Sequence, residues 1–120
     1  NEIHLSLRQN LFNTNYFGSV FGGSLFSMVD LVTAPFLQNA LGKEFVVSDL
    51  KSEITFWRPA KGLIKGKINI SDKEILHLIE SLDKEKSIDY SFAIDLFNET
   101  NQRVTQNQKL LRIRLKLKHF

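Results

Sequence analysis

The sequence predicts an α+β fold in which one long helix is covered by a curved antiparallel sheet. Three observations support this prediction. The stretch that follows Gly23 is mostly apolar at helical spacing, five other segments have strand patterns, and the turns between the later strands are short. Short turns favour antiparallel pairing. A helix with so wide an apolar surface needs a cover, and a sheet wrapped around it is the simplest one.

The first element is a strand that is buried on one face. Ile3, Leu5 and Leu7 alternate with three polar residues, which is the period of a half-buried strand. Residues 10–15 contain three Asn and a Thr, and this composition predicts a turn.

The long helix is predicted between Gly23 and Gly42. Pro35 removes one hydrogen bond within the helix and should bend it after Asp30, and Gly42 is a plausible stop. The apolar face is wide, so we expect this helix to be buried on most sides. The apolar residues at helical spacing occupy positions 25, 26, 28, 29, 32, 36 and 37.

The middle of the chain predicts two strands. Residues 45–57 are rich in β-branched and aromatic side chains, and Pro59 and Gly62 end this segment. Residues 63–70 alternate between apolar or glycine positions and polar ones, which indicates a second strand.

A second, shorter helix and two more strands complete the predicted fold. Ser71 with Glu74 three residues later has the form of a capping box, and an apolar stripe follows to Leu82. Strands are predicted over 87–97 and 104–117, joined by a turn at 98–102. In the last strand Leu111, Ile113, Leu115 and Leu117 alternate with basic residues.

Composition limits the class of protein. A chain of 120 residues suits one domain, predicted over 1–120, and 42% apolar with 24% charged residues is ordinary for a soluble protein. The chain has no cysteine, which excludes disulfides and thiolate chemistry and fits a reducing compartment. No apolar run reaches the roughly 18 residues of a membrane span, and no secretory signal is evident. We therefore expect a cytoplasmic protein with no membrane partner.

The positive charge is local. The net charge is +3, and six of the 16 Lys and Arg residues lie between 103 and 120, where there is no acid. Such a basic strand could bind nucleic acid, or it could form a solvated sheet face that discourages aggregation. No aromatic residue alternates with these bases to stack on nucleotides. We therefore predict no nucleic-acid partner, although some of these cations could hold the phosphates of a nucleotide-bearing substrate.

Three glycines precede the long helix, at positions 18, 22 and 23. Neither of the common phosphate-loop spacings is present. The simplest interpretation is that these glycines form a tight turn and nothing more. Amides at a helix start are nevertheless unpaired donors, and glycine lets a ligand approach them closely. The site would bind a phosphate, a carboxylate or a developing oxyanion.

Asp30 is a lone acid between apolar neighbours in this helix. It either lies on a narrow solvated stripe or is partly buried, and partial burial would raise its pKa and mark it as a functional candidate. The three His residues at positions 4, 77 and 119 are scattered, so no metal site and no His-based triad are expected.

Five residues around the start of the long helix have the spacing N-x-x-G-x-x-x-G-G-x-x-x-x-x-x-D. This pattern resembles the signature of phenylacetate-pathway-type hotdog-fold thioesterases. They are Asn15, Gly18, Gly22, Gly23 and Asp30. The chain is most similar to a subgroup of uncharacterised thioesterase-like hotdog proteins, which share F-G-G-S-L-F, L-G-K-x-F-x-V and the strand E-I-T-F-W-R-P-A-K-G. The likeness is specific from Asn15 to Gly62 and loose beyond.

The resemblance implies a hotdog fold: a long central helix wrapped by a five-stranded antiparallel sheet, with one extra short helix typical of the subgroup. It also implies a homodimer or a dimer of dimers that hydrolyses acyl-coenzyme A thioesters with no separate cofactor, because coenzyme A is part of the substrate. Gly22 would donate its amide to the thioester oxygen, Asn15 would orient the loop or the water, and Asp30 would be general base or nucleophile. Phe21, Gly23 and Phe26 would line the substrate site.

Two positions depart from the family pattern. In the family, a Ser or Thr early in the next strand usually assists the reaction. Alignment with the family pattern puts either Asp49 or Ser48 at that position, with Asp49 slightly preferred. The residue before the two glycines is usually His, and here it is Phe21. The site loses a polar group and gains apolar surface, so a non-catalytic acyl-binding or acyl-coenzyme A-binding module remains the alternative function.

Overall fold

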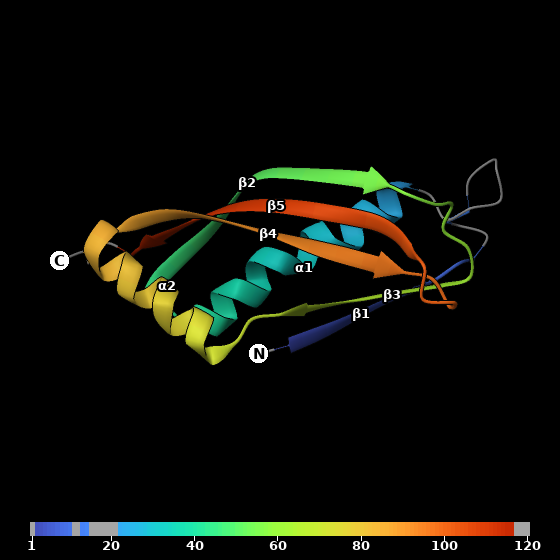
Figure 1. Cartoon of the computed structure of the whole chain (residues 1–120). Helices are drawn as coiled ribbons and strands as arrows, with labels where there is room; N and C mark the ends of the chain where they lie inside the picture. The colour runs from blue at the N-terminus through green and yellow to red at the C-terminus, as the bar shows by residue number, and fades with distance from the viewer. Residues whose placement is uncertain (1, 11–12, 15–21, 117–120) are drawn as a thin grey trace.

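A computed structural model describes residues 2–10, 13–14 and 22–116 of the chain. Five strands and two helices occur in the predicted order (Figure 1). Their bounds are β1 (Glu2–Arg8), α1 (Gly22–Leu41), β2 (Phe45–Phe56), β3 (Leu63–Asn69), α2 (Asp72–Glu85), β4 (Ser87–Phe97) and β5 (Arg103–Leu115).

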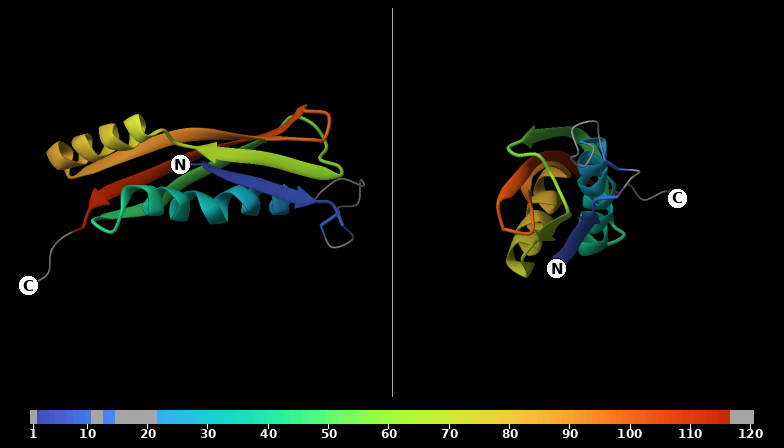
Figure 2. Two further views of the ribbon diagram at one scale, coloured as in Figure 1. Left: turned by 90° about the horizontal axis from the view of Figure 1, so that it is seen from below. Right: turned by 90° about the vertical axis from the view of Figure 1, so that its right-hand side faces the viewer.

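The five strands form one antiparallel sheet in the order β1-β3-β4-β5-β2. Helix α1 runs along one face of this sheet, and α2 lies near the end where β4 begins (Figure 2). The predicted α+β hotdog architecture, a long helix on a five-stranded antiparallel sheet with one extra helix, is therefore confirmed. Strands β1 and β2 are the two edges of the sheet.

Helix α1 is buried along one stripe rather than on most sides. Its buried residues recur every fourth position, because only one face of the helix meets the sheet. Leu31 is 72% exposed on the opposite side. The expectation of burial on most sides is thus wrong for a single chain, which leaves much of the helix uncovered. The buried stripe consists of Leu25, Val29, Thr33, Leu37 and Leu41.

Helix α1 and strand β2 run side by side in opposite directions. An added Cβ on Gly22 would lie 3.0 Å from the ring of Phe56, so the start of the helix touches the end of the strand. Near the other end, the Gln38 amide donates to the carbonyl of Phe45 at 2.7 Å and accepts from the amide of Val47 at 3.1 Å. Asp30 lies midway between these two contacts along the helix.

Helix α2 begins at the predicted cap. The hydroxyl of Ser71 accepts from the amide of Glu74 at 3.1 Å. The Glu74 carboxylate does not complete a capping box among the described residues, because it accepts from the hydroxyl of Tyr90 on β4 instead. This contact ties α2 to the sheet. Neither of the two described helices is both long and apolar enough to cross a membrane.

Strands β3 and β4 pair over a short distance, at Lys65 with Phe97 and at Gly66 with Leu96. A Cβ added at Gly66 would lie 2.5 Å from Cδ2 of Leu96 and 3.0 Å from the backbone oxygen of Asp95. The side chain could turn away, but the backbone oxygen could not move without disturbing the pairing. Glycine is therefore required here by close approach rather than by a turn.

We predict that Gly66→Ala destabilises the protein by about 1–3 kcal/mol, the usual cost of overpacking. This cost exceeds the gain of about 0.4–1 kcal/mol that alanine brings by restricting the unfolded chain. Chemical denaturation would measure the change. Lys67 on the same strand is exposed, so Lys67→Ala should change the free energy of unfolding by no more than about 0.5 kcal/mol. Equal stability of Gly66→Ala and the parent would contradict the close approach.

Candidate functional site

A lysine on β5 points into the molecule. Lys109 is 2% exposed, and its neighbours on the same face, Thr105 and Asn107, are buried as well. In the sequence, Lys109 is one of the six cations between 103 and 120, and it was not predicted as a site residue. The signal was present: the alternation of Leu111 and Ile113, continued two residues toward the N-terminus, puts Lys109 on the inward face.

The Lys109 ammonium contacts three oxygen atoms from two other elements. Nζ lies 2.6 Å from Oδ1 of Asp30, 2.6 Å from Oγ of Ser52 and 2.8 Å from Oδ1 of Asp49. An ammonium has three N–H donors, so these acceptors use all of them. We call these four residues the Lys109 cluster. Asp30 and Asp49 are predicted site residues that the structure brings together, whereas Ser52 and Lys109 were not predicted.

A β-bulge in β2 allows two of its side chains to reach the same lysine. Asp49 and Ser52 are three positions apart, and in a regular strand they would point to opposite faces. The pairing with β5 shifts between Asp49 and Lys51, so that Leu50 is an extra residue in β2. The bulge restores both side chains to the face that α1 covers, which is a typical use of bulges near functional sites.

Among the described residues, the partners of Asp30 all bind one of its two carboxylate oxygens. Oδ1 accepts from Lys109 and, at 3.2 Å, from the hydroxyl of Ser52. No residue in the described part of the chain donates a hydrogen bond to Oδ2. The side chain is 35% exposed, so the free oxygen belongs to a carboxylate that solvent reaches.

The charges in the cluster stabilise one another. The Lys109 hydrogen bond holds the pKa of Asp30 below its ordinary value, and this effect outweighs burial, which raises the pKa. The expectation of a raised pKa for Asp30 is therefore wrong, because the sequence did not reveal the partner. Burial lowers the pKa of Lys109, but its bonds to Asp30 and Asp49 outweigh burial and raise the pKa above its ordinary value. With both acids ionised, the cluster carries one net negative charge.

The predicted oxyanion donor lies at the start of the same helix. Gly22 is the first residue of α1 and rests against Phe56, while Asp30 is eight positions further along. At a rise of 1.5 Å per residue, about 12 Å separates the two residues along the helix. Gly23 is exposed and Phe26 is half-buried in the first turns. Asn15 and Phe21, and Gly18 of the motif, lie outside the described residues.

Of the two alternatives in β2, Asp49 reaches the cluster and Ser48 does not. Ser48 is exposed and faces Arg112 in the register with β5. Arg112 points outward and binds Asp89 at 2.9 Å, so Ser48 shares the outer face of the sheet. Ser48 is therefore unable to assist Asp30 within the same chain.

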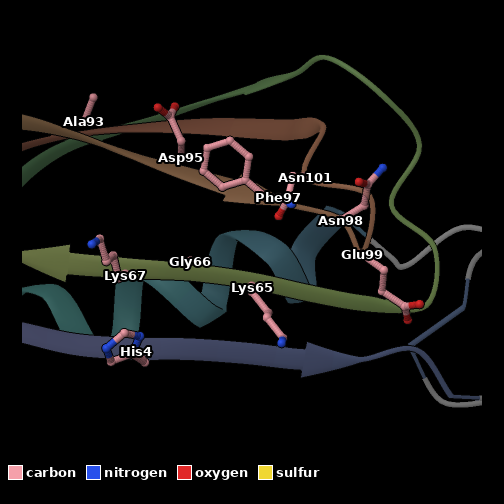
Figure 3. A pocket seen from close by; sticks show the side chains of 10 residues that line it. All are labelled: His4, Lys65, Gly66, Lys67, Ala93, Asp95, Phe97, Asn98, Glu99 and Asn101. Carbon is pink, nitrogen blue, oxygen red and sulfur yellow. The ribbon is translucent and has the colours of Figure 1, made fainter.

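A groove that does not include the Lys109 cluster lies on the outer face of the sheet where β3 and β4 meet (Figure 3). Its volume is about 550 Å³, and it contains none of the predicted site residues. Its lining includes charges of both signs, from Lys65 and Lys67 on β3 and from Asp95 on β4. Within the described ranges, no group of three or more His, Asp or Glu residues is placed to hold a metal ion.

We predict that stability depends on the ionised Asp30 in acid. A carboxylate whose pKa is lower in the folded state stabilises the protein above its unfolded pKa of about 4, and this stabilisation is lost as pH falls through the folded pKa. The free energy of unfolding should therefore fall more steeply below about pH 4 in the parent than in Asp30→Asn. Glu80→Gln on α2 lies outside the cluster and should keep the parent's slope. Urea denaturation from neutral to acid pH would measure the slopes, and equal slopes for parent and Asp30→Asn would contradict the ion pair.

Solved structures with the same fold cover almost the entire chain. A Pseudomonas aeruginosa protein of unknown function, described as a probable thioesterase, has a TM-score of 0.85 and 23% identity over 96% of this chain and 77% of its own. A Haemophilus influenzae thioesterase has a TM-score of 0.71 and 16% identity over 98% and 75%. A Streptococcus mutans protein bound to acetyl-CoA has a TM-score of 0.63 and 17% identity over 98% and 84%. At these identities the likeness shows the fold, and the hotdog fold predicted from the sequence is confirmed.

None of the curated protein sequences matches this chain. One family model matches it over residues 1–113, which include both helices, the Lys109 cluster and all of the sheet except the last two residues of β5. The chain therefore belongs to the DUF4442 family, a domain of unknown function.

Proposed function

We propose that this protein is an acyl-coenzyme A thioesterase in which Asp30 is the general base or the nucleophile. One observation carries the proposal: Asp30 is held at Oδ1 by Lys109 and Ser52, while no described residue binds Oδ2. A carboxylate fixed in this way stays ionised and offers one oxygen to a water molecule or to a carbonyl carbon. Positioned carboxylates of this kind are what acid–base and nucleophilic catalysis require.

In the proposed reaction the thioester oxygen accepts a hydrogen bond from the Gly22 amide. The amide then stabilises the negative charge that develops on this oxygen. As general base, Asp30 takes a proton from a water molecule whose oxygen attacks the carbonyl carbon. The carbon–sulfur bond breaks, and the sulfur of coenzyme A leaves with a proton. As nucleophile, Asp30 attacks the carbon directly, and the carbon–sulfur bond breaks as coenzyme A leaves as its thiolate. Water then hydrolyses the resulting anhydride, which regenerates the Asp30 carboxylate and releases the acyl group as a carboxylic acid, while the remaining proton goes to the thiolate.

Other residues have supporting roles in this proposal. Asn15 orients the loop or the water, and Phe21, Gly23 and Phe26 line the substrate site. Asp49 acts through Lys109 rather than on the substrate. The reaction needs no separate cofactor, and the cysteine-free composition suits the cytoplasm, where we place the protein.

The structural likenesses support the substrate class. Several proteins of the same fold are described as thioesterases, and the Streptococcus mutans protein binds acetyl-CoA. These descriptions concern other chains. They agree with the geometry around Asp30, which offers an ionised carboxylate on a helix that begins with glycine.

We further propose that the active site forms between two copies of the chain. About 12 Å separates Gly22 from Asp30 along one helix, whereas a thioester carbon and its oxygen are bonded neighbours. Two helices related by a two-fold axis bring Gly22 of one chain beside Asp30 of the other. Large exposed apolar side chains on β2, on the residue that follows it and on the outward face of α1 support this arrangement. These residues are Leu31, Leu50, Phe56 and Trp57.

A second candidate is a non-catalytic module that binds acyl groups or acyl-coenzyme A. The ion pair favours it, because a carboxylate with a lowered pKa is a weaker base. Phe21 in place of the usual His favours it as well. A panel of acyl-coenzyme A esters separates the candidates: an enzyme releases free thiol, whereas a binding module binds the esters without release.

We predict that Asp30→Asn lowers the rate of thioester hydrolysis by at least about a hundredfold, the lower end of what a positioned base contributes. The substitution keeps the shape and removes the charge. Release of free thiol from acyl-coenzyme A would measure the rate. Asp89→Asn on the outer face is the matched control, and its rate of hydrolysis should stay within about twofold of the parent rate. An Asp30→Asn protein as fast as the parent would exclude Asp30 from catalysis.

We also predict that two inactive variants restore activity when mixed. Gly22→Val places a side chain against Phe56 and blocks the approach to the amide, and Asp30→Asn removes the base. After the two proteins are unfolded and refolded together, each mixed dimer has one site with both defects and one with neither. Activity should reach about half of the parent value per mixed dimer. Mixed dimers confirmed by native mass spectrometry but without activity would argue against a shared site.

A further inference from the structure

The Lys109 ammonium is too enclosed to act on a substrate itself. Its side chain is 1% exposed, and its three donors already bind Asp30, Asp49 and Ser52. A substrate oxygen could take a hydrogen bond from this lysine only by displacing one of these partners. Any effect of Lys109 on a reaction must therefore pass through the residues that it holds.

Two carboxylates meet at this one ammonium. Because Oδ1 of Asp30 and Oδ1 of Asp49 both bind Nζ, the distance between these oxygens cannot exceed the two bonds together. Like charges this close repel each other, and a cation bound to both reduces the repulsion. Lys109 thus offsets the repulsion between two carboxylates that the bulge in β2 brings together.

We propose that Lys109 is the positioning residue of this site: it clamps the ionised Asp30 and Asp49 together through one oxygen of each and leaves Oδ2 of Asp30 open to substrate or water. Ser52 completes the clamp, because its hydroxyl accepts from Lys109 and donates to the same oxygen of Asp30. Rotation of the Asp30 carboxylate would break two hydrogen bonds at once. The kinetic part of this inference rests on the proposed thioesterase function, whereas the electrostatic part does not.

The charged groups around Asp30 are few. Helix α1 contributes Asp30 itself, β2 contributes Asp49 and β5 contributes Lys109. The nearby Lys51 and Glu53 lie on the other face of β2, where they pair at 2.9 Å and are both exposed. Among the described residues, Lys109 is thus the only cation bound to either carboxylate.

The experiment follows the titration of the Asp30 carboxyl group by carbon-13 NMR in protein labelled at aspartate, with Asp30→Asn used for assignment. In Lys109→Met the Asp30 pKa should rise by about one to three units, because an adjacent opposite charge is lost and the charge of Asp49 remains. In the double variant Lys109→Met/Asp49→Asn part of this rise should disappear. Lys51→Met on the outer face of β2 makes the same chemical change and should leave the titration unchanged.

The kinetic readout is the pH dependence of thioester hydrolysis. Lys109→Met should move the acid limb of kcat/KM to higher pH by the same amount, and should lower kcat more than it changes KM. A merely structural lysine would lower activity at every pH without moving the limb. If no variant hydrolyses thioesters but the NMR shift occurs as expected, the proposed function fails and the clamp stands.

A second variant covers the case in which Lys109→Met does not fold. Asp49→Asn removes an exposed charge and leaves the lysine to Asp30 alone, so the Asp30 pKa should fall further. An Asp30 titration unchanged by Asp49→Asn, or by a folded Lys109→Met, would overturn the clamp.

Discussion

The burial of one ammonium group constrains the centre of this structure. A lysine enclosed by protein must find acceptors for its three donors and a compensating charge, because an unpaired buried charge costs several kcal/mol. Lys109 meets both demands with side chains from α1 and β2, so one residue on β5 fixes the helix, the edge strand and the inner strand relative to one another. The candidate site is the place where these three elements join, and its chemistry follows from how the ammonium is paired.

The same junction depends on a match between helix and strand geometry. A helix rises 1.5 Å per residue and a strand about 3.3 Å, so eight residues of α1 cover about the length of four residues of β2. Gly22 meets Phe56, and Asp30 comes within reach of Ser52, four positions back along the strand. Gln38 then meets Val47, five positions further back, and the extra residue Leu50 accounts for the difference. The bulge therefore turns Asp49 inward and also keeps helix and strand in step.

Hydrophobic periodicity predicted the fold well because it depends on local spacing. The order of the elements, the start of α2 at Ser71 and the antiparallel sheet all follow from patterns within short segments. The site was predicted in part. Asp30 was singled out as an acid among apolar neighbours, but its pKa was expected to rise, since nothing near it in sequence reveals Lys109, 79 positions away. Ser52 was missed because its orientation depends on the bulge at Leu50, which appears only when β2 is paired with β5.

Asp30 lies beside a stretch of the edge strand β2 that exposes apolar side chains. Helix α1 covers the open edge of β2 only at Phe45 and Val47, where Gln38 binds the backbone. Beyond Asp49 no strand of the described ranges pairs with this edge, and the exposed Leu50 and Phe56 lie along it. An edge strand with apolar side chains and free backbone groups favours pairing with another chain. The ionised carboxylate of Asp30 lies beside this same stretch, so a second copy that covered the edge would also enclose the free oxygen and lower the local dielectric around it. Protection of the edge and completion of the site would then be one event.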